Sequence, residues 1–153
     1  IVRFRNPDIN TEVWFVALGA ELAGNGGMNA FLDEHAQDMR GAIIIDLDAL
    51  GAGDLTLIEK EGAYLPRQAS SRMRRLVKKA SGAVGLTVGS GSMTWMDSAA
   101  ACAMRRGCQT MHLAGMEGGK PAYFGQSDDV VENVSAEKMA VNADFVMELL
   151  KSI

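Results

Sequence analysis

Little in this sequence could hold the chain together covalently or fix it in a membrane. Its 153 residues include only two cysteines, Cys102 and Cys108, too few for a disulfide scaffold and wrongly spaced for a zinc knuckle. We expect both to be free, half-buried thiols. No apolar run approaches the roughly 20 residues that a membrane-spanning helix requires. The sequence also shows no charged and apolar leader of the signal-peptide kind.

The charge balance gives no reason to expect a nucleic-acid partner. The net charge is −4, from 15 basic residues against 19 acidic ones. A hydrophobic fraction of 48% and a charged fraction of 22% are typical of a globular domain. The length predicts a single domain over residues 1–153. Because the chain opens on Ile1 rather than Met, we expect it to be a fragment of a longer protein.

Strand-like and helix-like patterns alternate along the chain. Apolar or alternating runs predict a buried strand at 12–18, a short half-exposed one at 55–59, and others at 42–47, 84–88 and 109–113. Helical spacing predicts helices at 28–39, 67–80, 98–106 and from Ser135 onwards, with a loop at 89–97. The inward stripe of the last helix is predicted to be Met139, Ala143, Val146 and Leu150. The order of elements predicts an α/β fold, layered α/β/α, with a twisted, largely parallel (mixed) sheet.

Three acidic residues are predicted to meet at the carboxyl edge of this sheet. Glu21 follows the first strand, Asp48 ends the second, and Asp97 precedes a helix. Ligands of open α/β sheets bind at this edge, so we expect one shared cleft. Asp46 alternates with Asp48, and we expect only one of the two to face the cleft. Structural alternatives stay open: Glu21 could stabilise a helix N-terminus, and the aspartates could cap loop amides.

Two histidines and one basic segment are further candidates. His35 lies on the apolar stripe of its helix, where we expect a packed or half-exposed histidine. His112 lies in an apolar strand; we expect a core residue there, and a substitute metal ligand is the alternative. Residues 67–79 (RQASSRMRRLVKK) hold six basic residues. We expect a solvated helix face, with an anionic lipid or nucleic-acid surface as the alternative.

Four segments resemble motifs of one family, the di-zinc exopeptidases related to bacterial leucyl aminopeptidase and glutaminyl cyclase. They follow the family's order and are FVALGAELAGNGGMNAFL, IIIDLDALG, WMDSAAACAMRRGCQTMHL and YFGQSDDVVENVSAEKM. The resemblance implies a zinc-exopeptidase-like domain of which this chain holds the C-terminal two thirds, incomplete at the N-terminus. In that family two zinc ions activate a bridging water, and a glutamate moves its proton. An exported or membrane-anchored parent protein would fit the family, although the sequence itself assigns no compartment.

Carried over position by position, the resemblance predicts a metal site that is mostly lost. Glu21 matches the general base, and Asp48 matches a zinc-binding carboxylate. Leu22 and Gly125 fall where the family has two further ligands, and the remaining two would lie upstream of Ile1. One carboxylate does not hold zinc at useful affinity, because zinc sites need three or four protein ligands.

We therefore predict a metallopeptidase-like domain that has lost its di-zinc site and serves as a non-catalytic binding or structural module. Glu21 would be a relic general base, Asp48 and Asp97 would line an old cleft for a peptide or small polar ligand, and no cofactor is expected. The alternative is a working zinc-dependent aminopeptidase or amidohydrolase whose other ligands lie upstream. We also expect self-association or contact with an upstream segment, since a truncated domain exposes apolar surface.

Overall fold

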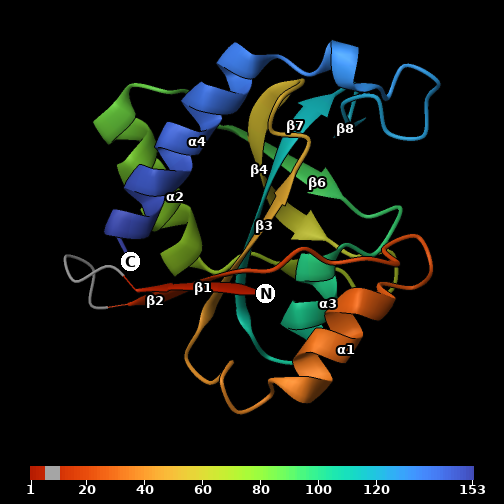
Figure 1. Cartoon of the computed structure of the whole chain (residues 1–153), viewed down its shortest axis with the longest axis vertical. Coiled ribbons are helices and arrows are strands. Elements are labelled where there is room, and N and C mark those ends of the chain that lie inside the picture. Colours follow the sequence, from red (N-terminus) through yellow and green to blue (C-terminus); the bar gives the residue numbers. More distant parts are fainter. Residues whose placement is uncertain (6–10) are drawn as a thin grey trace.

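A mixed sheet lies between two pairs of helices in the computed structural model, which describes residues 1–5 and 11–153 (Figure 1). The strands are β1 (Val2–Arg5), β2 (Glu12–Phe15), β3 (Ile43–Asp48), β4 (Asp54–Glu61), β5 (Arg67–Gln68), β6 (Gly89–Met93), β7 (Gln109–Glu117) and β8 (Lys120–Pro121). The helices are α1 (Gly26–Glu34), α2 (Ser71–Val84), α3 (Ala99–Arg105) and α4 (Ala136–Lys151), with a 3-10 turn at Val131–Asn133. Within these ranges no helix is both long and apolar enough to span a membrane.

The main sheet is built around β4 and β7. β7 pairs in parallel with β3 and antiparallel with β4, and β4 pairs in parallel with β6. The short strands β5 and β8 add antiparallel pairs to β4 and β7. β1 and β2 form a separate antiparallel pair. The predicted α/β fold with a mixed sheet is confirmed.

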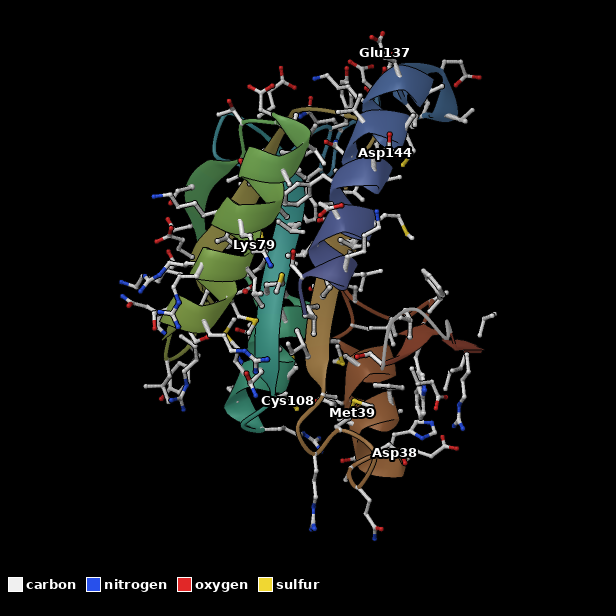
Figure 2. All side chains as sticks on the ribbon, turned by 90° about the vertical axis from the view of Figure 1, so that its left-hand side faces the viewer. Asp38, Met39, Lys79, Cys108, Glu137 and Asp144 are labelled. Atoms are coloured by element: carbon white, nitrogen blue, oxygen red, sulfur yellow. The ribbon has the colours of Figure 1, made fainter. Side chains whose placement is uncertain are left out.

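Each face of the sheet is covered by one helix pair. α2 and α4 pack side by side over the larger apolar core, which includes Leu57, Met111, Leu113, Met73 and Phe145 (Figures 1 and 2). On the opposite face α3 carries only small side chains from residue 99 to residue 103, so it lies close to β3 and β7. α1 packs against α3. The predicted free thiols are confirmed: one is buried in α3 and the other is half-buried just after it.

Serine side chains begin three of the helices. The hydroxyl of Ser70 accepts a hydrogen bond from the amide of Met73, and Ser98 and Ser135 make the equivalent bond at the start of α3 and α4. Each satisfies one of the amides that the first turn of a helix leaves unpaired. The predicted cap at Ser135 is therefore confirmed.

The segment from residue 84 to residue 93 differs from its prediction. The predicted strand at 84–88 is absent because α2 continues to Val84 and ends at Gly85, whose φ of 68° closes the helix. The strand is instead β6, in the segment predicted as a loop. The sequence did not indicate β6 because the strand consists mainly of glycine and serine. The glycines are needed for close approach of the strands, since a Cβ on Gly89 or Gly91 would lie 3.0 Å from Thr56 of β4.

Two other strands and the last helix also depart from expectation. β4 is not short and half-exposed but an eight-residue strand with neighbours on both sides, buried over most of its length. β2 is shorter than predicted and not buried, with Phe15 57% exposed. In α4 the buried residues are Asn142, Phe145 and Leu149, one position away from the predicted stripe. Asn142 fixes this rotation, because its side-chain amide donates to the carbonyl of Leu50 over 2.7 Å.

Candidate ligand site at the carboxyl end of strand β3

Asp46 and Asp48 bring two carboxylates to the same side of β3. We expected only one to face the cleft, and this was wrong, because residues two apart on a strand point the same way. Both aspartates influence the pKa of Glu21, so both lie near it. Asp46 is further tied to α3, where its Oδ2 accepts a hydrogen bond from the amide of Ala100 over 2.9 Å. Asp46 thus fulfils the structural alternative of capping amides while also contributing charge to the site.

Glu21 reaches these aspartates from the loop that joins β2 to α1. Partial burial raises the pKa of Glu21, the charges of Asp48 and Asp46 raise it further, and His112 opposes them. The loop is held by its own backbone, since the carbonyl of Glu21 accepts from the amide of Asn25 over 2.9 Å. Asn25 is the N-cap of α1, and the first turn of that helix contains no acidic residue. Glu21 therefore lies outside the helix terminus, which does not support the helix-dipole alternative.

Asp48 is the centre of this acidic cluster. Burial raises the pKa of its carboxyl, and the charges of Asp46 and Asp129 raise it further. His112 and the amide of Ala49 act in the opposite direction. Four carboxylates therefore share one region and are only partly balanced, which makes it attractive to a cationic ligand.

Beneath the acidic cluster lies a buried polar group that the sequence analysis missed in part. His112 and Glu61 are 1% and 0% exposed, and the Nδ1 atom of His112 lies 3.0 Å from Oε2 of Glu61. The hydroxyl of Ser98 donates to the same carboxylate oxygen. His112 is therefore a core residue, as predicted. Glu61 was not recognised because a bulge in β4 between Ile58 and Lys60 breaks the alternation that would assign its direction.

The surroundings of His112 favour its protonated form, because they raise the pKa of its imidazole. Burial by itself lowers the pKa of His112, but the hydrogen bond to Glu61 and the charges of Asp46, Glu61 and Asp48 together raise it. Oε1 of Glu61 and Nε2 of His112 have no hydrogen-bond partner among the described residues. When His112 is protonated, its charge acts on Glu61 below it and on Glu21, Asp46 and Asp48 above it.

Asp97 is held in a different environment from Glu21 and Asp48. Its Oδ1 atom lies 2.9 Å from Arg105 and accepts a hydrogen bond from the amide of Ala63 over 3.0 Å. These interactions lower the pKa of Asp97, the bond from Arg105 most strongly. The backbone carbonyl of Asp97 accepts from the side chain of Asn25 over 2.8 Å. In this arrangement Asp97 joins α3, the loop after β4 and the start of α1, and a binding role for it stays a prediction.

An apolar pocket opens at the same end of β3, and Asp129 is the one member of the acidic cluster that lines it. The cavity has a volume of about 330 Å³ and is lined mainly by Leu47, Leu50, Tyr123, Val130, Val134 and Met139. Leu47 and Ala49, the chain neighbours of Asp48, both line it, and Asp129 is its acidic residue. Sequence analysis did not find this pocket, because its walls come from the end of β3, the loop after β8 and the start of α4.

The residues present do not fit a two-metal centre. Leu22 points an apolar side chain into solvent and is 81% exposed. Gly125 has no side chain at all, and a Cβ built on it would meet no atom within 4 Å. Within residues 1–5 and 11–153, no group of three or more His, Cys, Asp or Glu side chains is arranged to hold a metal ion. Oxygen ligands are available at Glu21 and Asp48, but the donors that would complete a zinc shell are not among the described residues.

The fold and the motif order together define a peptidase-like α/β domain. The model of Peptidase family M28 matches residues 2–150, and the chain belongs to this family. No curated protein matches the chain at a significant level.

Solved structures of aminopeptidases share the fold. The Legionella pneumophila LapA aminopeptidase matches 94% of this chain and 40% of its own, with a TM-score of 0.74 and 13% identity. A second structure of LapA matches 93% of this chain and 40% of its own, with a TM-score of 0.67 and 12% identity. BSAP, a zinc aminopeptidase from Bacillus subtilis, matches 92% of this chain and 36% of its own, with a TM-score of 0.67 and 17% identity. The chain spans about two fifths of the length of these relatives.

Proposed function

We propose that this is an M28 domain without a working two-zinc site, which serves as a binding or structural module. The observation that carries the proposal is the chemistry at Leu22 and Gly125, where the family resemblance expects zinc ligands. An isobutyl group and a glycine offer no donor atom, and Leu22 is 81% exposed rather than turned toward the acidic cluster. Asp48 then stands as one carboxylate where three or four ligands are needed per metal.

Metal content separates this proposal from its alternative, a zinc-dependent aminopeptidase or amidohydrolase completed by ligands outside the chain. The full-length protein that contains this chain and any segment upstream of it is incubated with zinc, desalted and analysed by plasma mass spectrometry, and aminoacyl-amide hydrolysis is assayed in parallel. We expect much less than one zinc per chain and no turnover. The double variant L22E/G125H, which restores donor atoms, is the positive comparison and should retain more zinc than the wild type. One tightly held zinc per wild-type chain, or zinc-dependent turnover, would refute the proposal.

For the ligand, we infer a small amine that carries an apolar group. The acidic cluster of Glu21, Asp46, Asp48 and Asp129 favours a cation, and the pocket at the same end of β3, which Asp129 also lines, offers apolar walls. A ligand that fills both gains charge attraction and burial of apolar surface. Peptides with a free N-terminus and an apolar first residue have this chemistry.

This ligand class can be tested by nuclear magnetic resonance titration with leucinamide and N-acetylleucinamide, which differ in the charged amine. We expect leucinamide alone to bind, in the millimolar range expected for so small a ligand. Asp129→Asn should weaken binding, and Asp144→Asn, which removes an exposed charge from α4, should not. Equal binding of both compounds, or flat titrations with both, would refute the assignment.

A further inference from the structure

The basic residues of this chain are concentrated in α2 and in the short strand β5 just before it. Residues 67–79 hold six of the 15 basic residues and none of the 19 acidic ones, which leaves nine basic residues against 19 acidic ones elsewhere. The rest of the chain is therefore strongly acidic, and the molecule is electrically one-sided. Such a molecule orients in the field of a charged surface even though its net charge is negative.

The packing of α2 directs these charges outward. Its buried line is Met73, Val77 and Ala80, so the basic positions of the helix fall on the opposite side. Figure 2 shows this side, with nitrogen-tipped side chains projecting from α2 and Lys79 on its surface. Three arginines lie within the first five residues of the helix, where the dipole already favours negative charge, so the arrangement costs helix stability.

Few of these cations are neutralised within the protein. Arg74 pairs with Glu59 at 3.6 Å, where both are well exposed, and Arg72 donates to the side-chain oxygen of Gln109. Among the described residues no carboxylate pairs with Arg75, Lys78 or Lys79. The outer face of α2 is thus a convex row of solvated cations.

The shape and composition of this face select the partner. We propose that the outer face of α2, carrying Arg72, Arg74, Arg75, Lys78 and Lys79, docks the domain onto a bilayer with anionic lipid headgroups. A convex face needs no groove to contact a flat surface, and each basic residue near such a surface contributes attraction. α2 lies against α4, so it cannot enter the major groove of a duplex alone. α2 also has no aromatic residue on which an unpaired base could stack.

The test is co-sedimentation of the chain with vesicles of phosphatidylcholine alone or with about one third phosphatidylserine. We expect binding to the mixed vesicles only, lost when salt is raised from about 0.1 M to about 0.5 M. The variant Arg75→Gln/Lys79→Gln should bind roughly tenfold to thirtyfold more weakly. The control Arg40→Gln/Lys120→Gln removes the same two charges from exposed positions off this helix and should bind as the wild type does.

Three results would overturn the proposal. The first is no binding of the wild type to the mixed vesicles at low salt. The second is an equal loss in both double variants, which would mean that net charge and not this face is responsible. The third is stronger binding to a short DNA duplex than to the vesicles at equal phosphate concentration, which would assign the face to nucleic acid. Unfolding curves of both variants establish that each is folded before binding is compared.

Discussion

At the scale of single residues, Asp48 lies near more negative charge than the neighbouring positive charge neutralises. Burial, Asp46 and Asp129 raise its pKa in the folded state. A carboxyl whose pKa is raised by folding contributes stability fully when the pH is below its ordinary pKa of about 4. This contribution is lost as the pH rises through the folded-state pKa. Asp48→Asn should therefore increase the free energy of unfolding at neutral pH, by about 0.5–1 kcal/mol, and urea titration measures this gain.

The control for this effect is Asp144→Asn, since Asp144 is exposed on α4 (Figure 2). It should change stability by less than about 0.5 kcal/mol. At about pH 3, where the carboxyl of Asp48 is protonated, the gain of Asp48→Asn should disappear. A loss of stability at neutral pH would contradict the prediction and show that the carboxylate holds the loop together.

The pair of His112 and Glu61 gives a second prediction at this scale. Each side chain offsets the free-energy cost of burying the other. His112→Leu leaves the Glu61 carboxylate buried without its partner and should cost about 3–5 kcal/mol. The double variant Glu61→Met/His112→Leu removes both charges and should be more stable than His112→Leu. If the double variant loses as much free energy of unfolding as Glu61→Met and His112→Leu lose in sum, the two side chains act independently.

The same pair sets a pH dependence. The raised pKa of His112 means that its contribution is complete at low pH and is lost as pH rises through the folded-state value. Unfolding in urea at about pH 6 and about pH 9 should show lower stability of the wild type at the higher pH. In Glu61→Met/His112→Leu this part of the decrease should be missing.

At the scale of elements, Ser98 differs from the other capping serines. Its hydroxyl accepts from the amide of Ala101 and also donates to Glu61, whereas Ser70 and Ser135 only cap. Ser135→Ala should cost about 1 kcal/mol. Ser98→Ala should cost about 1–2 kcal/mol more, because it also removes a hydrogen bond to a buried charged group. Equal losses in the two variants, measured by thermal unfolding, would mean that the bond to Glu61 contributes nothing.

Gly115 lies where β7 approaches the loop after β3 closely. A Cβ at this position of β7 would lie 1.9 Å from the carbonyl of Ala52 and 2.2 Å from that of Ala49, in the loop after β3. Gly115→Ala should therefore displace the loop that follows Asp48 and cost more than about 3 kcal/mol. The matched control is Gly82→Ala in α2, where a Cβ meets nothing within 4 Å; it should stabilise by about 0.5–1 kcal/mol. A small loss of stability in Gly115→Ala would contradict the close approach of β7 to the loop after β3.

The elements that the sequence predicts well are those whose signal is local. The helix predicted at 67–80 is present as α2, although it begins at Ser71 because Arg67 and Gln68 form β5, and the cap at Ser135 is present. Both signals depend on spacing within one segment. β6 was missed because its glycines are required by contact with Thr56, which lies 33 or more positions earlier. The rotation of α4 was missed because it depends on the bond from Asn142 to Leu50, again far away in the chain. Local pattern therefore predicts an element, and distant contacts decide its register.

At the scale of the whole molecule, the candidate site shows the same division. The topology rule for α/β sheets placed Glu21 and Asp48 at one edge, and the structure brings their charges together. The pocket joins the end of β3, the loop after β8 and the start of α4, and the Glu61–His112 pair joins β4 to β7, so no single segment indicates either of them. The bulge in β4 that turns Glu61 inward also has no mark in the sequence. Chemistry carried by residue type was therefore predictable, whereas the shape of the site was not.

The apolar surface around the pocket leads to a prediction about assembly. Leu47, Val130, Val134 and Met139 line the pocket and are all more than one third exposed, so they form one continuous patch. Such a patch on an isolated domain favours association with a second copy. Sedimentation velocity should show the average mass rising with concentration. Val130→Glu should suppress this rise, because a charge would have to be desolvated at the contact. The control Leu65→Glu replaces an exposed leucine outside the pocket and should associate as the wild type does. A constant monomer mass of the wild type, or equal suppression of association by both variants, would contradict the patch as the contact.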